Sequence, residues 1–131
     1  MLLQVLGTAA GGGIPQWNCA CPGCSGARAH PERRRRHASL AVGTDDGRWY
    51  VVNATPDIGD QIEAHPELRP EPGTRRTPIA GVVLTDAELD HTLGLARRRE
   101  ADGGEINATH PVPPARTHRQ RHEHGRGSNT T

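Results

Sequence analysis

Three cysteines within six positions constrain this chain more than any other feature of its sequence. Cys19, Cys21 and Cys24 are all the cysteines that the 131 residues contain. An odd number of thiols does not close into a full set of internal disulfides, whereas three closely spaced thiolates suit Zn²⁺. Pro22 and Gly23 suit the central positions of a type II turn, which would bring the sulfurs of Cys21 and Cys24 to one side. The sequence therefore predicts a structural zinc site.

The pattern leaves the fourth zinc ligand open. His30 and His37 follow the cysteines and would complete a tetrahedral set, but both also suit exposed loop positions. A zinc ion would compensate for a thin core, because hydrophobic residues make up 33% of the chain and aromatic residues 2%. Structural zinc contributes on the order of 10 kcal/mol to the folding of small domains. The alternative is three thiols without a role.

Charge and hydropathy argue against several classes of partner. The net charge of +1 gives no overall attraction to nucleic acid or to an acidic membrane. The arginine run at residues 33–36 would suit the phosphate contacts of a zinc-based nucleic-acid module, but a second Cys or His pair at finger spacing is absent. No stretch approaches the roughly 20 apolar residues of a membrane helix, and no secretion signal is evident. We expect a cytoplasmic protein with no nucleic-acid partner and no membrane span.

Apolar periodicity predicts an α+β fold. Strands are expected at residues 2–7, 39–43, 48–54, 79–84 and 104–109, with a hairpin turn at 44–47. Helices are expected at 57–65 and from Leu89 to residue 100, and a loop at 66–78, whereas residues 25–37 form a polar stretch. Residues 113–131 are rich in His, Arg and Pro and lack large apolar side chains, so we expect a disordered basic tail.

An acid-rich turn follows the fourth expected strand. Asp86, Glu88, Asp90 and His91 gather three carboxylates and one imidazole where the chain enters a helix. Repulsion among the carboxylates favours a bound divalent cation, and oxygen-rich ligation favours a hard ion such as iron or manganese. The alternative is a capping box, because Thr85 and Glu88 have its spacing and acids in a first helical turn suit the helix dipole. The residues alone leave both interpretations open.

Three ordered motifs carry a resemblance to a known family. GTAAGGGIPQWNCACPGC begins at Gly7, NATPDI at Asn53 and LTDAELDHTLGL at Leu84. Together they resemble the pyrroloquinoline quinone (PQQ) synthesis protein B family, a branch of the metallo-β-lactamase fold, over residues 2–110. The implied fold is the N-terminal part of an αββα sandwich. Residues 1–112 would form this incomplete domain and would include the zinc loop at 19–24.

The resemblance also implies site residues. TDAELDH takes the place of the superfamily's metal motif, with Asp86 and Glu88 where its first two histidines stand, whereas Asp90 and His91 keep the superfamily's identity. The implied catalytic residues are therefore Asp90 and His91. The implied structural zinc ligands are Cys19, Cys21 and Cys24, and the implied ligands of a second divalent metal, with iron as a candidate, are Asp86, Asp90 and His91.

The implied function lies in PQQ biosynthesis. The resemblance leaves two roles open: metal-dependent hydroxylation of a tyrosine-derived precursor, in company with other PQQ biosynthesis proteins, or carriage of PQQ or its precursor toward the periplasm. A phosphodiesterase or other hydrolase of the same fold is one alternative, disfavoured because a histidine is expected where Asp86 stands. A non-catalytic zinc-binding interaction module is the other.

Two features depart from the resemblance. Family members are longer, so the second half of the sandwich, with a distal histidine expected to complete the zinc site, falls outside the 131 residues. Arg97 and Arg98 stand at helix positions where the family would place apolar residues. We therefore expect a fragment or a reading-frame disruption after residues 96–112, inactive by itself.

Overall fold

One mixed sheet organises the molecule. The computed structural model describes residues 1–101 and 103–108, so the tail predicted at 113–131 and the domain boundary predicted at 112 lie outside the described residues. The strands run in the order β1-β2-β3-β4-β5 across the sheet. They are β1 Leu2–Gly7, β2 Ser39–Gly43, β3 Trp49–Val52, β4 Ile79–Leu84 and β5 Glu105–Ala108. All five predicted strands are confirmed, with the third and fifth shorter than predicted.

Strand directions follow from the connections. β1 pairs antiparallel with β2, and β2 pairs antiparallel with β3, to which it is joined by a short turn in which Gly47 takes a φ of 82°. β3 pairs with β4, and β4 with β5, in parallel, and each of these connections passes through helical segments. The carboxyl ends of β3 and β4 therefore meet at one edge of the sheet. The segments that begin at Asn53 and Thr85 leave from that edge.

Six helical segments accompany the sheet in the described residues. They are α1 Pro22–Ala29, η1 Pro31–Arg33, α2 Ile58–Glu63, η2 Pro66–Leu68, α3 Leu89–Thr92 and η3 Leu93–Glu100, the η segments being 3₁₀ helices. The helix predicted at 57–65 is confirmed as α2. The single helix predicted from Leu89 to residue 100 instead changes from α to 3₁₀ geometry after one turn.

One prediction for the cysteine segment is wrong. Pro22 and Gly23 do not form a type II turn, because they are the first two residues of α1, with Cys21 as the N-cap. The polar stretch at 25–37 contains the rest of α1 and all of η1, and the loop predicted at 66–78 begins with η2. The fixed φ of a proline suits the first position of a helix as well as it suits a turn, and the cysteine thiol caps the helix.

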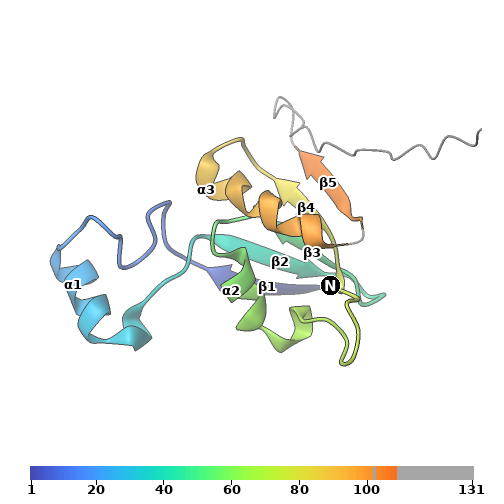
Figure 1. Ribbon diagram of the computed structural model, residues 1–131, viewed down its shortest axis with the longest axis horizontal. Coiled ribbons are helices and arrows are strands. Elements are labelled where there is room, and N and C mark those ends of the chain that lie inside the picture. The colour runs from blue at the N-terminus through green and yellow to red at the C-terminus, as the bar shows by residue number, and fades with distance from the viewer. Residues whose placement is uncertain (102, 109–131) are drawn as a thin grey trace, which may run out of the picture.

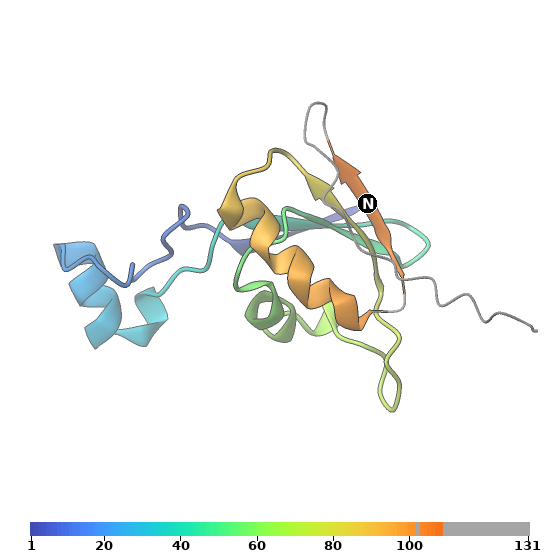
Figure 2. The same cartoon turned by 45° about the horizontal axis from the view of Figure 1, so that its top comes forward.

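The core lies between one face of the sheet and the helices. Figures 1 and 2 show α2 and the α3–η3 segment side by side over the same face, whereas α1 extends away from the sheet. Side chains from β2 and β3 alternate between this buried face and the opposite face, which is only partly covered, whereas β4 is buried at four of its six positions. The core cluster is Leu6, Ala41, Trp49, Val51, Ala54, Ile58, Leu68, Ile79, Val82 and Leu84.

In the part of the chain that the structure describes, no helix has the length and apolar character needed to span a membrane.

Candidate metal centres

The three cysteine sulfurs come together at the start of α1. The Sγ atoms of Cys19, Cys21 and Cys24 all lie within 4.8 Å of one another, and all three thiols are free. Three sulfurs bound to one tetrahedral zinc ion at about 2.3 Å lie roughly 3.8 Å apart, so a small inward movement would fit them to the ion. Cys24 is buried, Cys19 partly buried and Cys21 exposed. The donor set and its spacing therefore fit zinc.

Backbone groups hold the cysteine cluster in place. The Cys24 N–H donates to the Cys21 sulfur at 3.5 Å, and the Gln16 N–H donates to the Cys24 sulfur at 3.4 Å. The Arg28 guanidinium donates to the carbonyl oxygens of Cys19 at 2.6 Å and Gln16 at 2.8 Å. Arg28 thus joins the far end of α1 to the segment that precedes it.

The thiols differ in acidity. The backbone N–H of Cys24, together with the thiols of Cys19 and Cys24, lowers the pKa of Cys21 to about 7. The backbone N–H of Cys21 acts to lower the pKa of Cys19, but thiol hydrogen bonds with Cys21 and Cys24 outweigh it and raise that pKa. Negative charge therefore collects first on Cys21, at the helix N-terminus.

Neither candidate histidine joins the sulfurs. Among the described residues the ligand group consists of the three cysteines. The His30 Nδ1 lies 3.6 Å from a Glu32 oxygen, and its side chain is half exposed. The His37 ring lies between the Gly11 carbonyl oxygen and the Asp57 carboxylate, 2.8 Å from the first and 3.1 Å from the second. The proposal that His30 or His37 is the fourth ligand finds no support in this geometry.

The acid-rich turn is fixed to the end of β3. Asn53, at a φ of 66°, accepts hydrogen bonds at its side-chain oxygen from the Thr85 N–H at 3.0 Å and the Thr85 hydroxyl at 3.1 Å. The Ala54 N–H donates to the His91 carbonyl oxygen at 2.8 Å, and the Gly94 N–H donates to the Ala54 carbonyl oxygen at 2.9 Å. The NATPDI motif therefore positions the start of α3.

The capping-box interpretation is wrong. The helix begins at Leu89, Glu88 occupies its N-cap position, and no side chain caps its backbone. Thr85, three residues earlier, instead directs its hydroxyl to Asn53 and to Asp86.

His91 lies between two carboxylates. Its Nδ1 is 2.7 Å from Asp86 Oδ1, and its Nε2 is 3.5 Å from Asp90 Oδ2. The Glu88 N–H, donating at 2.9 Å, and the His91 ring together hold the pKa of Asp86 below its usual value. Because an ionised Asp86 accepts the Nδ1 proton, the lone pair of a neutral His91 ring resides on Nε2, on the side of Asp90. The structure thus brings Asp86, Asp90 and His91 together around the imidazole.

The glycine-rich loop lies against Asp90. A Cβ atom on Gly11 would lie 3.0 Å from Asp90 Oδ2, so glycine leaves this carboxylate accessible. His37 holds the loop through the Gly11 carbonyl oxygen, and Asp57 holds His37 by accepting from its backbone N–H at 3.2 Å. The sequence motifs contain Gly11 and Asp57, but sequence reasoning gave neither of them a role.

The arginine run has a local structural use. Arg34 donates to the Ala27 carbonyl oxygen at 3.2 Å, and Arg36 donates to the Asp60 carbonyl oxygen at 2.9 Å. Arg35 Nη1 donates to the carbonyl oxygens of Glu32 and Arg34. These bonds tie the α1–η1 segment to itself and to α2, which weakens the interpretation of the run as a phosphate-binding patch.

Comparison with known proteins identifies a family. Residues 48–128 match the family model of the beta-lactamase superfamily domain. A coenzyme PQQ synthesis protein B from Rhodopseudomonas palustris is 50% identical over 101 residues, which cover 76% of this chain and 33% of that protein. The protein of the same name from Methylobacterium nodulans is 48% identical over 110 residues, covering 82% of this chain and 37% of that protein. The chain therefore spans about a third of the length of the curated relatives it matches.

Two solved structures share the fold. The crystal structure of Zn²⁺-bound PqqB from Methylobacterium extorquens superposes with a TM-score of 0.80 at 45% identity, covering 86% of this chain and 38% of that chain. A diphosphatase from the PhnP family superposes with a TM-score of 0.58 at 32% identity, covering 75% of this chain and 34% of that chain.

Proposed function

We propose, from the premise that the chain belongs to the β-lactamase superfamily, that it acts in the biosynthesis of PQQ. Within that pathway the role that its site supports best is metal-dependent hydroxylation of a tyrosine-derived precursor. The observation that carries this proposal is the orientation of His91, whose Nε2 lies beside Asp90 while Asp86 accepts from its Nδ1.

The residues of the acid-rich turn fit a hard divalent metal. An imidazole nitrogen and a carboxylate oxygen are ligands of iron sites that react with oxygen, and such sites keep open positions for substrate. We assign Asp90 and His91 as ligands. A bound iron ion would supply the oxygen chemistry of a hydroxylation. Asp86, which the sequence also suggested as a ligand, would act by holding the Nδ1 proton and so fixing the His91 tautomer.

Neighbouring residues would shape this centre without binding the metal. Asn53 anchors the turn at Thr85, and Gly11 leaves room in front of Asp90. The Asp86 and Asp90 carboxylates also make the site negative, which favours a cation there. A peptide-derived precursor and other PQQ biosynthesis proteins are the partners that this role requires.

The cysteine cluster would hold the structural zinc. The PqqB from Methylobacterium extorquens was crystallised in a Zn²⁺-bound form, and the sulfur spacing in this chain supports the same ion. The cluster lies in the arm that carries α1, away from the sheet (Figure 1). Zinc there would order the arm and, through the glycine-rich loop that precedes it, the approach to Asp90.

Substitution at the native locus tests the pathway role. Asp90→Ala or His91→Ala should abolish PQQ production, which is measured by reconstituting a quinone-dependent dehydrogenase with cell extract. Glu88→Gln is the matched control, because Glu88 contributes its backbone N–H and not its side chain to the turn. Unimpaired PQQ production by both alanine variants would remove the assigned role.

Hydrolysis is the second candidate, because the PhnP-family diphosphatase shares the fold. It predicts zinc-dependent or manganese-dependent cleavage of a phosphodiester such as bis-p-nitrophenyl phosphate, lost in His91→Ala. We disfavour it because an aspartate, Asp86, stands where a hydrolase of this fold is expected to keep a histidine. Carriage of PQQ has no support in the names of the relatives, and we do not propose it.

A further inference from the structure

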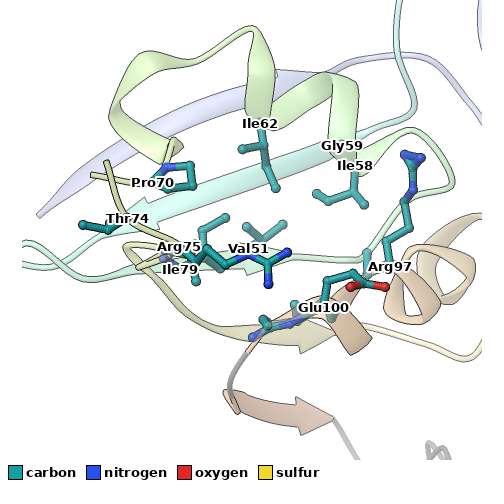
Figure 3. A pocket seen from close by; sticks show the side chains of 15 residues that line it. Val51, Ile58, Gly59, Ile62, Pro70, Thr74, Arg75, Ile79, Arg97 and Glu100 are labelled. Atoms are coloured by element: carbon teal, nitrogen blue, oxygen red, sulfur yellow. Dashed lines mark hydrogen bonds between the residues drawn. The ribbon is translucent and has the colours of Figure 1, made fainter. Parts of the chain in front are cut away.

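An apolar cavity lies under the helices, away from both candidate metal centres. It has a volume of about 410 Å³, within the range of small-molecule sites. Figure 3 shows Ile58 and Ile62 of α2 facing Val51 and Ile79 of the sheet across this space. None of Asp86, Asp90, His91 or the cysteines lines it. The cavity therefore belongs to neither site described above.

Arg98 brings a partly buried cation to the cavity wall. Its Nη1 is shielded from solvent and has no hydrogen-bond partner among the described residues. Burial lowers the pKa of this guanidinium, which shows that its surroundings oppose the charge. A buried guanidinium nitrogen without an acceptor is costly, because it loses its hydration and gains nothing in return. An acceptor that entered the cavity would remove this cost.

The rest of the wall has the same sign of charge. Arg75 and Arg97 also line the cavity and are exposed at its edge, whereas Glu100 is its single acidic lining residue. The Glu100 carboxylate is already engaged by Arg99, whose Nε lies 3.1 Å away. Three guanidinium groups and one carboxylate line the cavity, and that carboxylate is paired with Arg99, so the charge of the wall favours an anion. The aliphatic remainder of the wall favours a ligand with an apolar body.

We propose that this cavity binds a monocarboxylate with an aliphatic body, with the carboxylate on Arg98 and the body between α2 and the sheet. A planar guanidinium matches a carboxylate group, and each such charge-assisted hydrogen bond is stronger than a neutral one. The aliphatic body would contact the cavity-lining side chains of Ile58, Ile62, Val51 and Ile79. The site is a ligand site separate from the proposed chemistry at Asp90 and His91.

The isoleucines of the chain allow the site to be mapped directly. There are five, and Ile58, Ile62 and Ile79 line the cavity whereas Ile14 and Ile106 do not. Octanoate is titrated into protein with ¹³C-labelled isoleucine methyl groups, and methyl shifts are followed by NMR. We expect saturable shifts of the three cavity methyls, with little change at Ile14 and Ile106. Equal shifts at all five, or none at millimolar octanoate, would overturn the proposal.

Charge dependence tests the role of Arg98. Octanamide has the same body without the charge and should bind at least tenfold more weakly than octanoate. Arg98→Gln should remove this preference, whereas Arg33→Gln, the same charge change on the distant η1 segment, should keep it. Because Arg98→Gln removes a shielded Nη1 that has no acceptor among the described residues, it should fold at least as well as the parent chain. An unchanged preference for octanoate in Arg98→Gln would refute the assignment.

Discussion

His37 donates from Nε2 to the Gly11 carbonyl oxygen at 2.8 Å, which links the glycine-rich loop to the body of the domain. The other ring nitrogen lies 3.1 Å from Asp57 Oδ2, and both side chains are about four-fifths buried, with 18% and 20% exposed. Asp57 also accepts from the His37 N–H and from the Thr55 hydroxyl. Since Gly11 lies against Asp90, His37 positions the candidate catalytic turn without touching it.

The first prediction concerns this link. His37→Ala should lower the free energy of unfolding by about 1–3 kcal/mol, because it removes the hydrogen bond to Gly11 and the ring that packs against the Asp57 carboxylate. Urea denaturation followed by circular dichroism measures the change. The control is His30→Ala, whose half-exposed side chain makes a single long contact with Glu32. Equal stability of the two variants would mean that the His37 side chain contributes no more to the stability of the fold than the exposed His30 side chain does.

The second prediction concerns the cysteine cluster. Purified protein should hold about one zinc per chain, and cobalt in its place should give a strong thiolate charge-transfer band in the near ultraviolet. Cys24→Ser should abolish the band, because Cys24 is the buried member of the set. Removal of zinc by a chelator should unfold α1 and leave the sheet, because α1 lies away from the sheet in Figure 1. Ser25→Ala, which keeps all three sulfurs, serves as the control.

A cobalt-loaded protein without the band would contradict thiolate ligation. The same chelator experiment also separates a structural ion from an incidental one. An incidental ion would leave the helical signal of α1 unchanged when it is removed.

The third prediction tests how closely α3–η3 packs on the NATPDI motif. A Cβ on Gly94 would lie 2.2 Å from the Thr55 carbonyl oxygen, a backbone atom that cannot move aside cheaply. Gly94→Ala should therefore destabilise the fold by about 1–3 kcal/mol. Gly26→Ala in α1 is the matched control, because its new methyl group meets nothing nearer than an Arg33 nitrogen at 3.6 Å. Thermal unfolding of both variants measures the difference, and an unchanged melting temperature in Gly94→Ala would show that the helix shifts freely.

The strands were predictable because their signal is local. Residues 39–43 and 79–84 are short apolar runs bounded by turn residues, and burial alternates along the first of them. The type II turn was mispredicted because Pro followed by Gly suits two geometries. The Cys21 thiol, an unusual N-cap, decides between them by accepting from the Cys24 N–H.

The candidate site was only partly predictable for a physical reason. Asp86, Asp90 and His91 lie close in sequence, so their proximity is a local property of one turn. Three distant segments supply the other contacts near that turn, through Gly11, His37 and Asp57. Local sequence patterns do not reveal which distant segments will meet in the fold. The shielding of Arg98 Nη1 was likewise not predictable, because the residues around it come from strands and a helix far away in the chain.

The last prediction is a dependence of stability on pH that runs through Asp57. Burial acts to raise the pKa of its carboxyl group, but the adjacent His37 ring, together with hydrogen bonds from the Thr55 hydroxyl and the His37 N–H, outweighs this and holds the pKa below its ordinary value of 3.8. The folded state therefore binds this proton less tightly than the unfolded state does. It follows that Asp57 stabilises the fold above pH 3.8 and that this contribution is lost as the pH falls further, through the folded-state pKa.

Asp57→Asn isolates this contribution from those of other carboxylates. Unfolding free energies from urea titrations at pH 6 and pH 3 should show a loss on acidification that is smaller in Asp57→Asn than in the parent chain. At pH 6 the variant should be less stable, because an uncharged amide replaces the carboxylate that accepts from the His37 N–H and the Thr55 hydroxyl. At pH 3 the difference between the two proteins should be smaller than at pH 6, because the advantage of the Asp57 carboxylate shrinks as the pH falls below 3.8. The control is Asp45→Asn, which changes an exposed carboxylate that contacts the Met1 amino group. This variant should keep the parental dependence of stability on pH. Parallel pH profiles for Asp57→Asn and the parent would show that the Asp57–His37 pair contributes no net stability.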